Sequence, residues 1–105
     1  MEPDPDYEQK YRAQLKSIVL DECEGHACRV FLFGSRSKGR AGWAADFDIG
    51  IEEIDPALFT GLKRRILERV EESRIPWKVD IVNFDEADES FRKIALEEYE
   101  LWKSA

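Results

Sequence analysis

Residues 46–53 restrict the possible folds of this chain more than any other segment, because two kinds of side chain alternate strictly along them. Large apolar residues alternate with acidic or small ones, in the order Asp46, Phe47, Asp48, Ile49, Gly50, Ile51, Glu52. Successive side chains of a β-strand point to opposite faces of its sheet. The pattern therefore predicts a half-buried strand that carries two carboxylates on its polar face.

Patterns typical of helices and of two further strands surround this segment. Apolar residues recur at steps of three and four, the spacing of an amphipathic helix, from Tyr7 until the chain reaches Gly25. The members of this stripe are Tyr7, Tyr11, Leu15, Ile18 and Val19. Short runs rich in β-forming residues predict strands at residues 29–33 and 77–82.

Capping signals define the remaining two predicted helices. Asp55 followed by Pro56 is a typical helix start, and that helix is expected to end before Ile75. Its apolar stripe is Leu58, Leu62, Ile66 and Val70. Asp88 or Ser90 is expected to cap a last helix that runs to the end of the chain. The apolar residues of that helix are Phe91, Ile94, Ala95, Tyr99 and Trp102.

This order of elements predicts the α/β (α+β) class, with a single small mixed β-sheet flanked by helices. With 105 residues and 12.2 kDa, the chain has room for one domain. We expect a flexible tail at residues 1–6, where two prolines stand among acidic residues, and a single domain over residues 7–105.

The charge balance narrows the function classes. Sixteen Lys and Arg against 23 Asp and Glu give a net charge of −7 and a pI near 4.8. Such a balance argues against an extended nucleic-acid-binding face, which needs Lys and Arg to neutralise phosphates, but it leaves room for a small basic pocket. No stretch is apolar for long enough to cross a membrane, and the first residues are acidic. We therefore expect a soluble, cytoplasmic protein.

Cys23, His26 and Cys28 have a spacing that suggests a zinc site. A structural zinc ion takes four ligands, however, and the sequence has no further Cys or His. We therefore expect these three residues to be ordinary core and loop residues.

The chemistry is predicted to lie between the first strand and the acidic strand. On its own, the pair Asp46 and Asp48 fits either a cation site or a solvent-facing strand. The preceding segment 34–40, with the sequence GSRSKGR, offers glycines, hydroxyls and cations suited to a polyphosphate. It is not a P-loop, because Arg40 and Ala41 stand where that motif requires Lys and Ser or Thr.

These residues resemble the nucleotidyltransferase superfamily of DNA polymerase beta, and most closely its minimal single-domain members, the MNT proteins found beside HEPN proteins. The signature of this superfamily is Gly-Ser, ten or so residues, Asp-x-Asp, and a third acid on a later strand. Here Gly34-Ser35 is followed by ten residues and then Asp46-Phe47-Asp48, and Asp80 is the best candidate for the third acid. The resemblance extends from about residue 15 to the end of the chain and implies the polymerase beta-like nucleotidyltransferase fold.

The position of Asp80 depends on a register that sequence does not give. If its strand pairs beside the Asp-x-Asp strand with matching faces, Asp80 joins Asp46 and Asp48; alternatively, it is an edge residue or an ion-pair partner of Lys78. Glu52, on the same face as the Asp pair, is the substitute candidate. Trp43 in the loop is expected to be either a hydrophobic lid or a base-stacking residue.

The resemblance also implies a reaction: transfer of a nucleoside monophosphate from ATP or another nucleoside triphosphate to a hydroxyl, with two Mg²⁺ ions. Asp46, Asp48 and Asp80 would hold the metal ions and act in catalysis, with Asp80 as the base. Nucleotide binding would fall to four residues of the glycine-rich turn, Gly34, Ser35, Arg36 and Lys38. Ala45 stands where the superfamily usually has serine, so this chain lacks one hydroxyl near the predicted metal site.

By the same resemblance, the acceptor is expected on a partner of the HEPN family, which the MNT member adenylylates as an antitoxin; self-association is a further possibility. Two other functions stay open from sequence alone. One is a non-catalytic antitoxin or nucleotide-binding module that acts by binding a HEPN-type partner, and the other is a nucleotide sensor.

Overall fold

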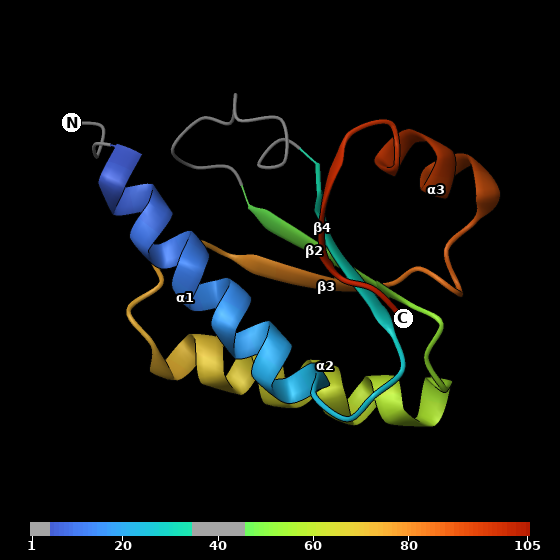
Figure 1. Ribbon diagram of the computed structural model, residues 1–105, viewed down its shortest axis with the longest axis horizontal. Helices are drawn as coiled ribbons and strands as arrows, with labels where there is room; N and C mark the ends of the chain where they lie inside the picture. The colour runs from blue at the N-terminus through green and yellow to red at the C-terminus, as the bar shows by residue number, and fades with distance from the viewer. Residues whose placement is uncertain (1–4, 35–45) are drawn as a thin grey trace.

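The computed structural model describes residues 5–34 and 46–105, and these form a four-stranded mixed sheet with three helices (Figure 1). The elements in chain order are α1 (Pro5–Cys23), β1 (Arg29–Phe33), β2 (Phe47–Glu52), α2 (Pro56–Glu72), β3 (Val79–Asn83), α3 (Glu89–Ala95) and β4 (Tyr99–Lys103). The predicted fold class, a small mixed sheet flanked by helices, is confirmed. No helix in the described part of the chain is both long enough and apolar enough to span a membrane.

The strand order in the sheet is β3-β2-β1-β4. β1 pairs antiparallel with β2 on one side and with β4 on the other, whereas β2 and β3 run parallel. A parallel pair requires a crossover connection, and α2 provides it between β2 and β3. This crossover places the beginnings of β2 and β3 at the same end of the sheet, where β1 also ends.

Helices α1 and α2 cover one face of the sheet and form the main core with it. Figure 1 shows these two helices next to each other, away from α3. From α1, the predicted stripe residues Tyr11, Leu15, Ile18 and Val19 are buried against alternate residues of β1 and β2. Ion pairs at the surface join the two helices, with Glu22 of α1 lying 3.1 Å from Arg65 and 3.2 Å from Arg69.

The start of α2 follows the predicted capping chemistry. The side chain of Asp55 accepts a hydrogen bond from the backbone N–H of Ala57 at 2.8 Å, and Pro56 is the first helical residue. Leu62, Ile66 and Val70 are buried as the stripe predicts. The prediction was wrong for Leu58, the third residue of α2, which is 48% exposed.

A smaller aromatic cluster lies on the opposite face of the sheet, under α3. Phe31, Phe33 and Phe84 are its buried members, and Val82, Ala95 and Leu96 pack around them. Gly50 of β2 lies directly beneath the rings: a Cβ atom there would be 2.6 Å from Phe31 Cε2 and 2.9 Å from Phe84 Cδ1. Packing of these two rings on the sheet therefore requires glycine at position 50.

The C-terminal segment differs from the prediction. Asp88 caps α3 as expected, accepting from the N–H of Phe91 at 2.8 Å, but the helix ends at Ala95. Tyr99–Lys103 then forms β4, an antiparallel partner of β1. The spacing of Tyr99 and Trp102 resembles a helical stripe, yet Tyr and Trp also favour strands, and β1 has a second edge to satisfy with hydrogen bonds.

The N-terminal boundary also differs slightly. α1 begins at Pro5, so residues 5 and 6, expected in the flexible tail, are helical. Proline suits the first turn of a helix because the N–H that it lacks has no partner there. A proline near the start of a helical pattern is thus compatible with an earlier start.

Candidate active site

The parallel pairing of β2 with β3 determines where the predicted acidic residues lie. In this register Asp48 is the direct partner of Asp80, and Asp46 immediately precedes β2. Paired residues of neighbouring strands share a face and are about 4.8 Å apart between strands. The N–H of Phe47 donates to the carbonyl of Lys78 at 3.0 Å, which fixes the start of β2 against the start of β3. The backbone thus brings Asp80 beside Asp48. This is the arrangement expected if the strand of Asp80 pairs with the Asp-x-Asp strand and their faces match.

The electrostatics of Asp48 reflect this grouping of like charges. Burial raises the pKa of Asp48 above its ordinary value, and the carboxylates of Asp80 and then Asp46 raise it further. Lys78 has the opposite effect on this pKa, so its ammonium group lies near enough to offset part of the repulsion. Asp46 and Asp80 are exposed, whereas Asp48 is half-buried. A cation placed here would be attracted by all three carboxylates.

Gly34, which follows β1, brings its backbone against the Asp48 carboxylate. Its φ of +77° lies in the left-handed region, and a Cβ atom would be only 2.7 Å from Asp48 Oδ2. Any other residue at this position would face both backbone strain and a clash with a predicted site residue. The glycine of the Gly-Ser pair is therefore a structural part of the acidic site.

The donors at this site suit a hard divalent cation, because carboxylate oxygens are what Mg²⁺ prefers. Nevertheless, within residues 5–34 and 46–105, no three Asp, Glu, His or Cys side chains are close enough together to form a metal-binding group. The strands bring the carboxylates to one place, but the side chains do not form a finished coordination shell. Mutual repulsion, which the raised pKa of Asp48 reflects, favours such a separation.

Several predicted site residues fall outside the described part of the chain. Ser35, Arg36 and Lys38, expected to bind nucleotide, lie within residues 35–45, as do Trp43 and Ala45. Their roles stay predictions from the sequence.

Glu52, the substitute candidate for the third acid, has a different environment. It is buried at the far end of β2, where Oε1 lies 2.6 Å from Arg29 Nη1 and Oε2 lies 3.5 Å from Arg92 Nη2. Arg29 also donates to the hydroxyl of Tyr99 at 2.9 Å. The alternation in β2 correctly predicts that Glu52 lies on the same face as Asp48. Glu52 is four residues further along the strand, however, and there it joins an ion-pair network that links β1, β2 and α3.

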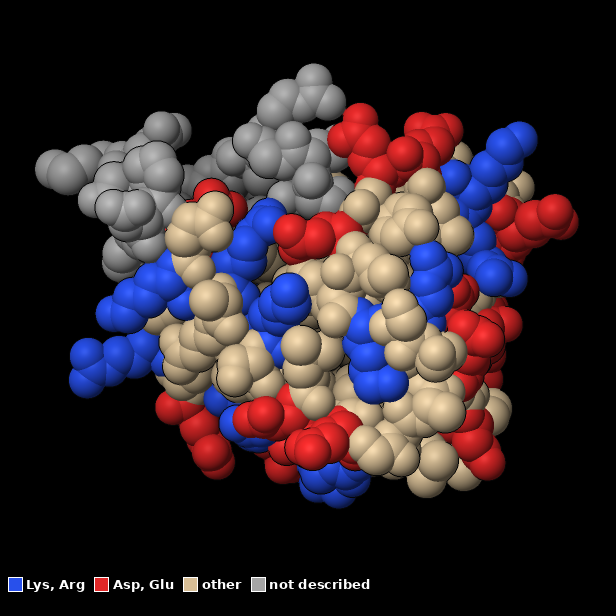
Figure 2. Space-filling view, viewed as in Figure 1, with Lys and Arg blue, Asp and Glu red and all other residues tan. Residues whose placement is uncertain are grey.

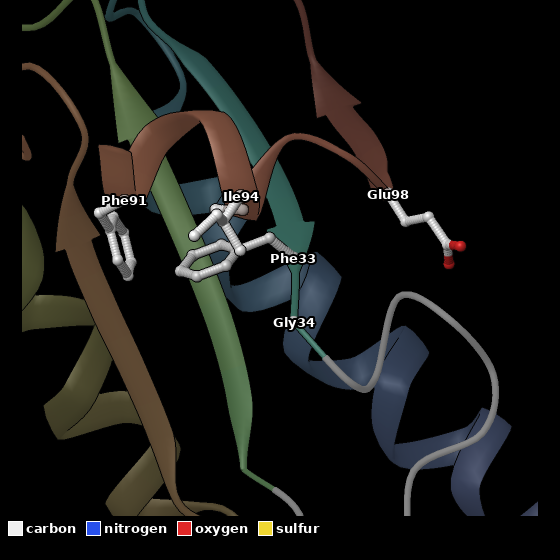
Figure 3. Close-up of a pocket in the computed structure, with 6 residues that line it drawn as sticks. Phe33, Gly34, Phe91, Ile94 and Glu98 are labelled. Carbon is white, nitrogen blue, oxygen red and sulfur yellow. The ribbon is translucent and has the colours of Figure 1, made fainter. Parts of the chain in front are cut away.

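A cavity of about 230 Å³ lies beside Gly34, between the end of β1 and helix α3 (Figure 3). Its lining is mostly apolar and consists of Phe33, Gly34, Phe91, Ile94, Ala95 and Glu98. No sequence pattern predicts this cavity, because its walls come from the end of a strand and from a helix whose orientation depends on tertiary packing. The sequence indicated that Lys78 shares a face with Asp80 and is a candidate ion-pair partner for it; the structure adds that Lys78 lowers the pKa of Asp48.

The Cys23 and Cys28 side chains belong to the main core, where both are fully buried. Burial, followed by the neighbouring Cys28, raises the pKa of the Cys23 thiol to about 12. A thiol with such a pKa is a poor nucleophile and a poor metal ligand at neutral pH. The two cysteines pack here as small apolar residues.

Comparison with known proteins identifies the family. The nucleotidyltransferase domain family matches residues 11–102, so the chain belongs to this family. A relative from Haemophilus influenzae (strain ATCC 51907 / DSM 11121 / KW20 / Rd), named Probable protein adenylyltransferase MntA, is 37% identical over 70 residues. These residues make up 67% of this chain and 60% of that protein, so the match spans less than two thirds of the relative's length.

Solved structures share the fold. A minimal nucleotidyltransferase superposes with a TM-score of 0.61 at 24% identity, over 87% of this chain and 91% of its own. A toxin–antitoxin complex with AMP-PNP gives 0.62 at 16% identity, over 86% of this chain and 73% of that one. The complex of a tri-AMPylated Shewanella oneidensis HEPN toxin with an MNT antitoxin gives 0.58 at 16% identity, over 92% and 72%.

Proposed function

We propose that this chain is a metal-dependent nucleotidyltransferase that transfers AMP from ATP to a hydroxyl group of a HEPN-family partner protein, as the antitoxin of a toxin–antitoxin pair. Membership of the nucleotidyltransferase domain family supports the reaction class. The name of the Haemophilus influenzae relative supports a protein acceptor, and the solved complexes support ATP and a HEPN partner. The observation that carries the proposal is the register that pairs Asp48 with Asp80.

In this proposal the three aspartates have two roles, cation binding and removal of a proton. Asp46 and Asp48 would hold divalent cations, and Asp80 would hold the cation on the acceptor side. When bound, such cations stabilise the charge that develops on the attacking and leaving oxygens. Asp80 would also take the proton of the acceptor hydroxyl.

The bond changes balance without any further reactant. The acceptor oxygen forms a bond to the α-phosphorus, the bond from that phosphorus to the bridging oxygen breaks, and pyrophosphate leaves. Gly34 would let the triphosphate approach the backbone, and Ser35 would bind it. Arg36 and Lys38 would neutralise its outer phosphates.

The test is an AMP-transfer assay with ATP labelled at the α-phosphate, Mg²⁺ and, as acceptor, the product of the gene next to that of this chain, which the proposal expects to be a HEPN-family protein. We expect label on that partner, and a loss of about 10³-fold in rate for Asp80→Asn, since removal of a catalytic base costs roughly 10²–10⁴-fold. Asp48→Asn should be similarly impaired. Asp21→Asn is the matched control, because it removes only an exposed ion pair with Arg69; its rate should equal that of the wild type.

Two outcomes would contradict the proposal. The first is absence of transfer with every nucleotide and divalent cation tried. The second is neutralisation of the partner's toxicity that persists in the Asp46→Ala, Asp48→Ala double variant, which would indicate an antitoxin that acts by contact alone.

A further inference from the structure

Exposed apolar side chains gather on α3 and β4. Within the described part of the chain, five large apolar residues are substantially exposed, and four of them come from the short segment 91–101. These four are Phe91 (41%), Ile94 (68%), Tyr99 (41%) and Leu101 (45%). Single exposed apolar residues are ordinary, but a contiguous group of them marks an interaction site.

The pairing of β4 with β1 places the strand members of this group on the same side as the helix members. Tyr99 is the partner of Phe33, and Leu101 is the partner of Phe31, so both lie on the sheet face that α3 covers. β4 is also an edge strand of the sheet. We call the surface formed by Phe91, Ile94, Tyr99 and Leu101 the α3–β4 surface.

The α3–β4 surface continues into the cavity beside Gly34. Phe91 and Ile94 belong both to this surface and to the cavity wall, and Figure 3 shows them above Phe33 at the end of β1. Gly34 lines this cavity and also adjoins Asp48, since a Cβ atom on Gly34 would be only 2.7 Å from Asp48 Oδ2. A molecule bound to this surface would therefore lie next to the acidic site.

Acidic residues flank this apolar group along the chain. Of the six acidic residues between positions 86 and 100, Glu100 is directed to Arg12 of α1 on the opposite face of the sheet, which leaves five beside two basic residues. One of these basic residues, Arg92, is directed to Glu52 within the fold. Figure 2 shows acidic side chains, interspersed with basic ones, along the upper and right-hand margins of the molecule, where α3 lies in Figure 1. An apolar centre with a charged rim is the usual anatomy of a protein–protein interface, and an acidic rim selects a basic partner.

We propose that the α3–β4 surface docks the acceptor protein, with an apolar side chain of the partner in the cavity and basic side chains facing Glu97 and Glu98. This inference rests on the proposed function, because it assigns a surface to the partner that the reaction requires. The acidic rim disfavours nucleic acid as the occupant, since phosphates need cationic contacts. Docking at this surface would bring a hydroxyl of the partner beside Asp48 and Asp80.

The experiment measures the dissociation constant for the acceptor protein of the transfer assay, the product of the neighbouring gene. Ile94→Glu and Leu101→Glu should each weaken binding by at least tenfold, because each places a charge in the apolar centre. Leu58→Glu is the matched control: Leu58 is 48% exposed but lies on α2, so binding should stay within twofold of the wild type. Wild-type affinity in both Ile94→Glu and Leu101→Glu, or absence of binding by the wild type, overturns the proposal.

A second measurement does not depend on the folding of any variant. Hydrogen exchange of the wild-type complex should show protection of residues 89–103 on binding and no change in residues 56–72. The reverse pattern overturns the proposal. So does self-association that Ile94→Glu abolishes while affinity for the partner is unchanged, because the surface would then belong to a second copy of this chain.

The outcome also separates this inference from the proposed function. Binding that Ile94→Glu weakens, without any transfer of AMP by the wild type, supports the docking surface and contradicts the reaction. Transfer of AMP with unchanged affinity in Ile94→Glu and Leu101→Glu supports the reaction and overturns the docking surface.

Discussion

The two faces of the sheet differ in how completely helices cover them. One face is covered by α1 and α2, two helices of 19 and 17 residues, and contains the large apolar core. The other is covered only in part by α3, a helix of seven residues, over a small aromatic cluster. The acids and the cavity lie on this second face. The difference indicates that most of the buried apolar core lies on one face, whereas the other face leaves the proposed site accessible, and four changes test this division.

The largest effect on stability is expected from Leu62→Ala on the covered face. Leu62 is fully buried, and removing a buried leucine side chain costs about 3 kcal/mol in the free energy of unfolding. Leu58→Ala on the same helix, at an exposed position, should cost less than about 0.5 kcal/mol. Urea denaturation measures both. Equal losses in the two variants would contradict the assignment of the main core.

Gly50→Ala tests the aromatic cluster of the open face. The new Cβ atom would be 2.6 Å from the Phe31 ring, so we expect a loss of about 2 kcal/mol in the free energy of unfolding. Gly61→Ala in α2 is the control, because its nearest contact is the flexible end of Arg65 at 3.2 Å. Alanine favours helix over glycine by about 1 kcal/mol, so this variant should be as stable as the wild type or more stable. A harmless Gly50→Ala would mean that the rings do not pack on the strand as described.

Addition of Mg²⁺ and ATP tests the acidic residues of the open face, because a ligand bound there would stabilise the folded domain. A ligand that binds only the folded state at ten times its dissociation constant adds about 1.4 kcal/mol, which raises Tm by several degrees in a domain of this size. Differential scanning fluorimetry of the wild type, Asp48→Asn and Asp21→Asn measures the effect. The shift should disappear in Asp48→Asn and persist in Asp21→Asn; a wild-type Tm that responds to neither ligand would argue against the cation site.

The smallest effect concerns Asp48 without ligand. Its pKa is raised in the folded protein, so the folded state resists ionisation of this group more than the unfolded chain does. The penalty is absent below the unfolded pKa, grows as the pH rises through the folded pKa, and is complete above it. Asp48→Asn should therefore raise Tm at pH 7 and have little effect near pH 3. Thermal melts at both pH values measure this; a variant less stable than the wild type at pH 7 would contradict the repulsion.

Much of the fold was accessible from sequence because local chemistry and tertiary packing agree in it. The alternation in β2 and the Asp55-Pro56 start of α2 each indicate one structure only. The last 15 residues were harder, because Tyr99 and Trp102 fit both a helical stripe and a strand. These residues form a strand because β1 has a free edge in the assembled sheet, and no local sequence pattern shows that edge.

The candidate site divides in the same way. The Gly34-Ser35 pair and the spaced acids were visible as a motif, but whether Asp80 stands beside Asp48 depends on strand register. For Glu52, sequence predicted the correct face of the sheet. It did not predict the ion-pair partners Arg29 and Arg92, because these belong to other elements. Sequence therefore identifies the chemical groups, and tertiary pairing decides which of them meet.

The parallel pairing of β2 with β3 also sets the time at which this site can first exist. Asp48 acquires Asp80 as a neighbour only after the chain has formed α2 and closed the crossover, a long-range step that carries a loop-closure cost. During synthesis on the ribosome, a nascent chain can already contain α1, β1 and β2 while β3 is still inside the exit tunnel. Such a chain has no assembled acidic site, so β3 must pair with β2 before the proposed reaction could take place.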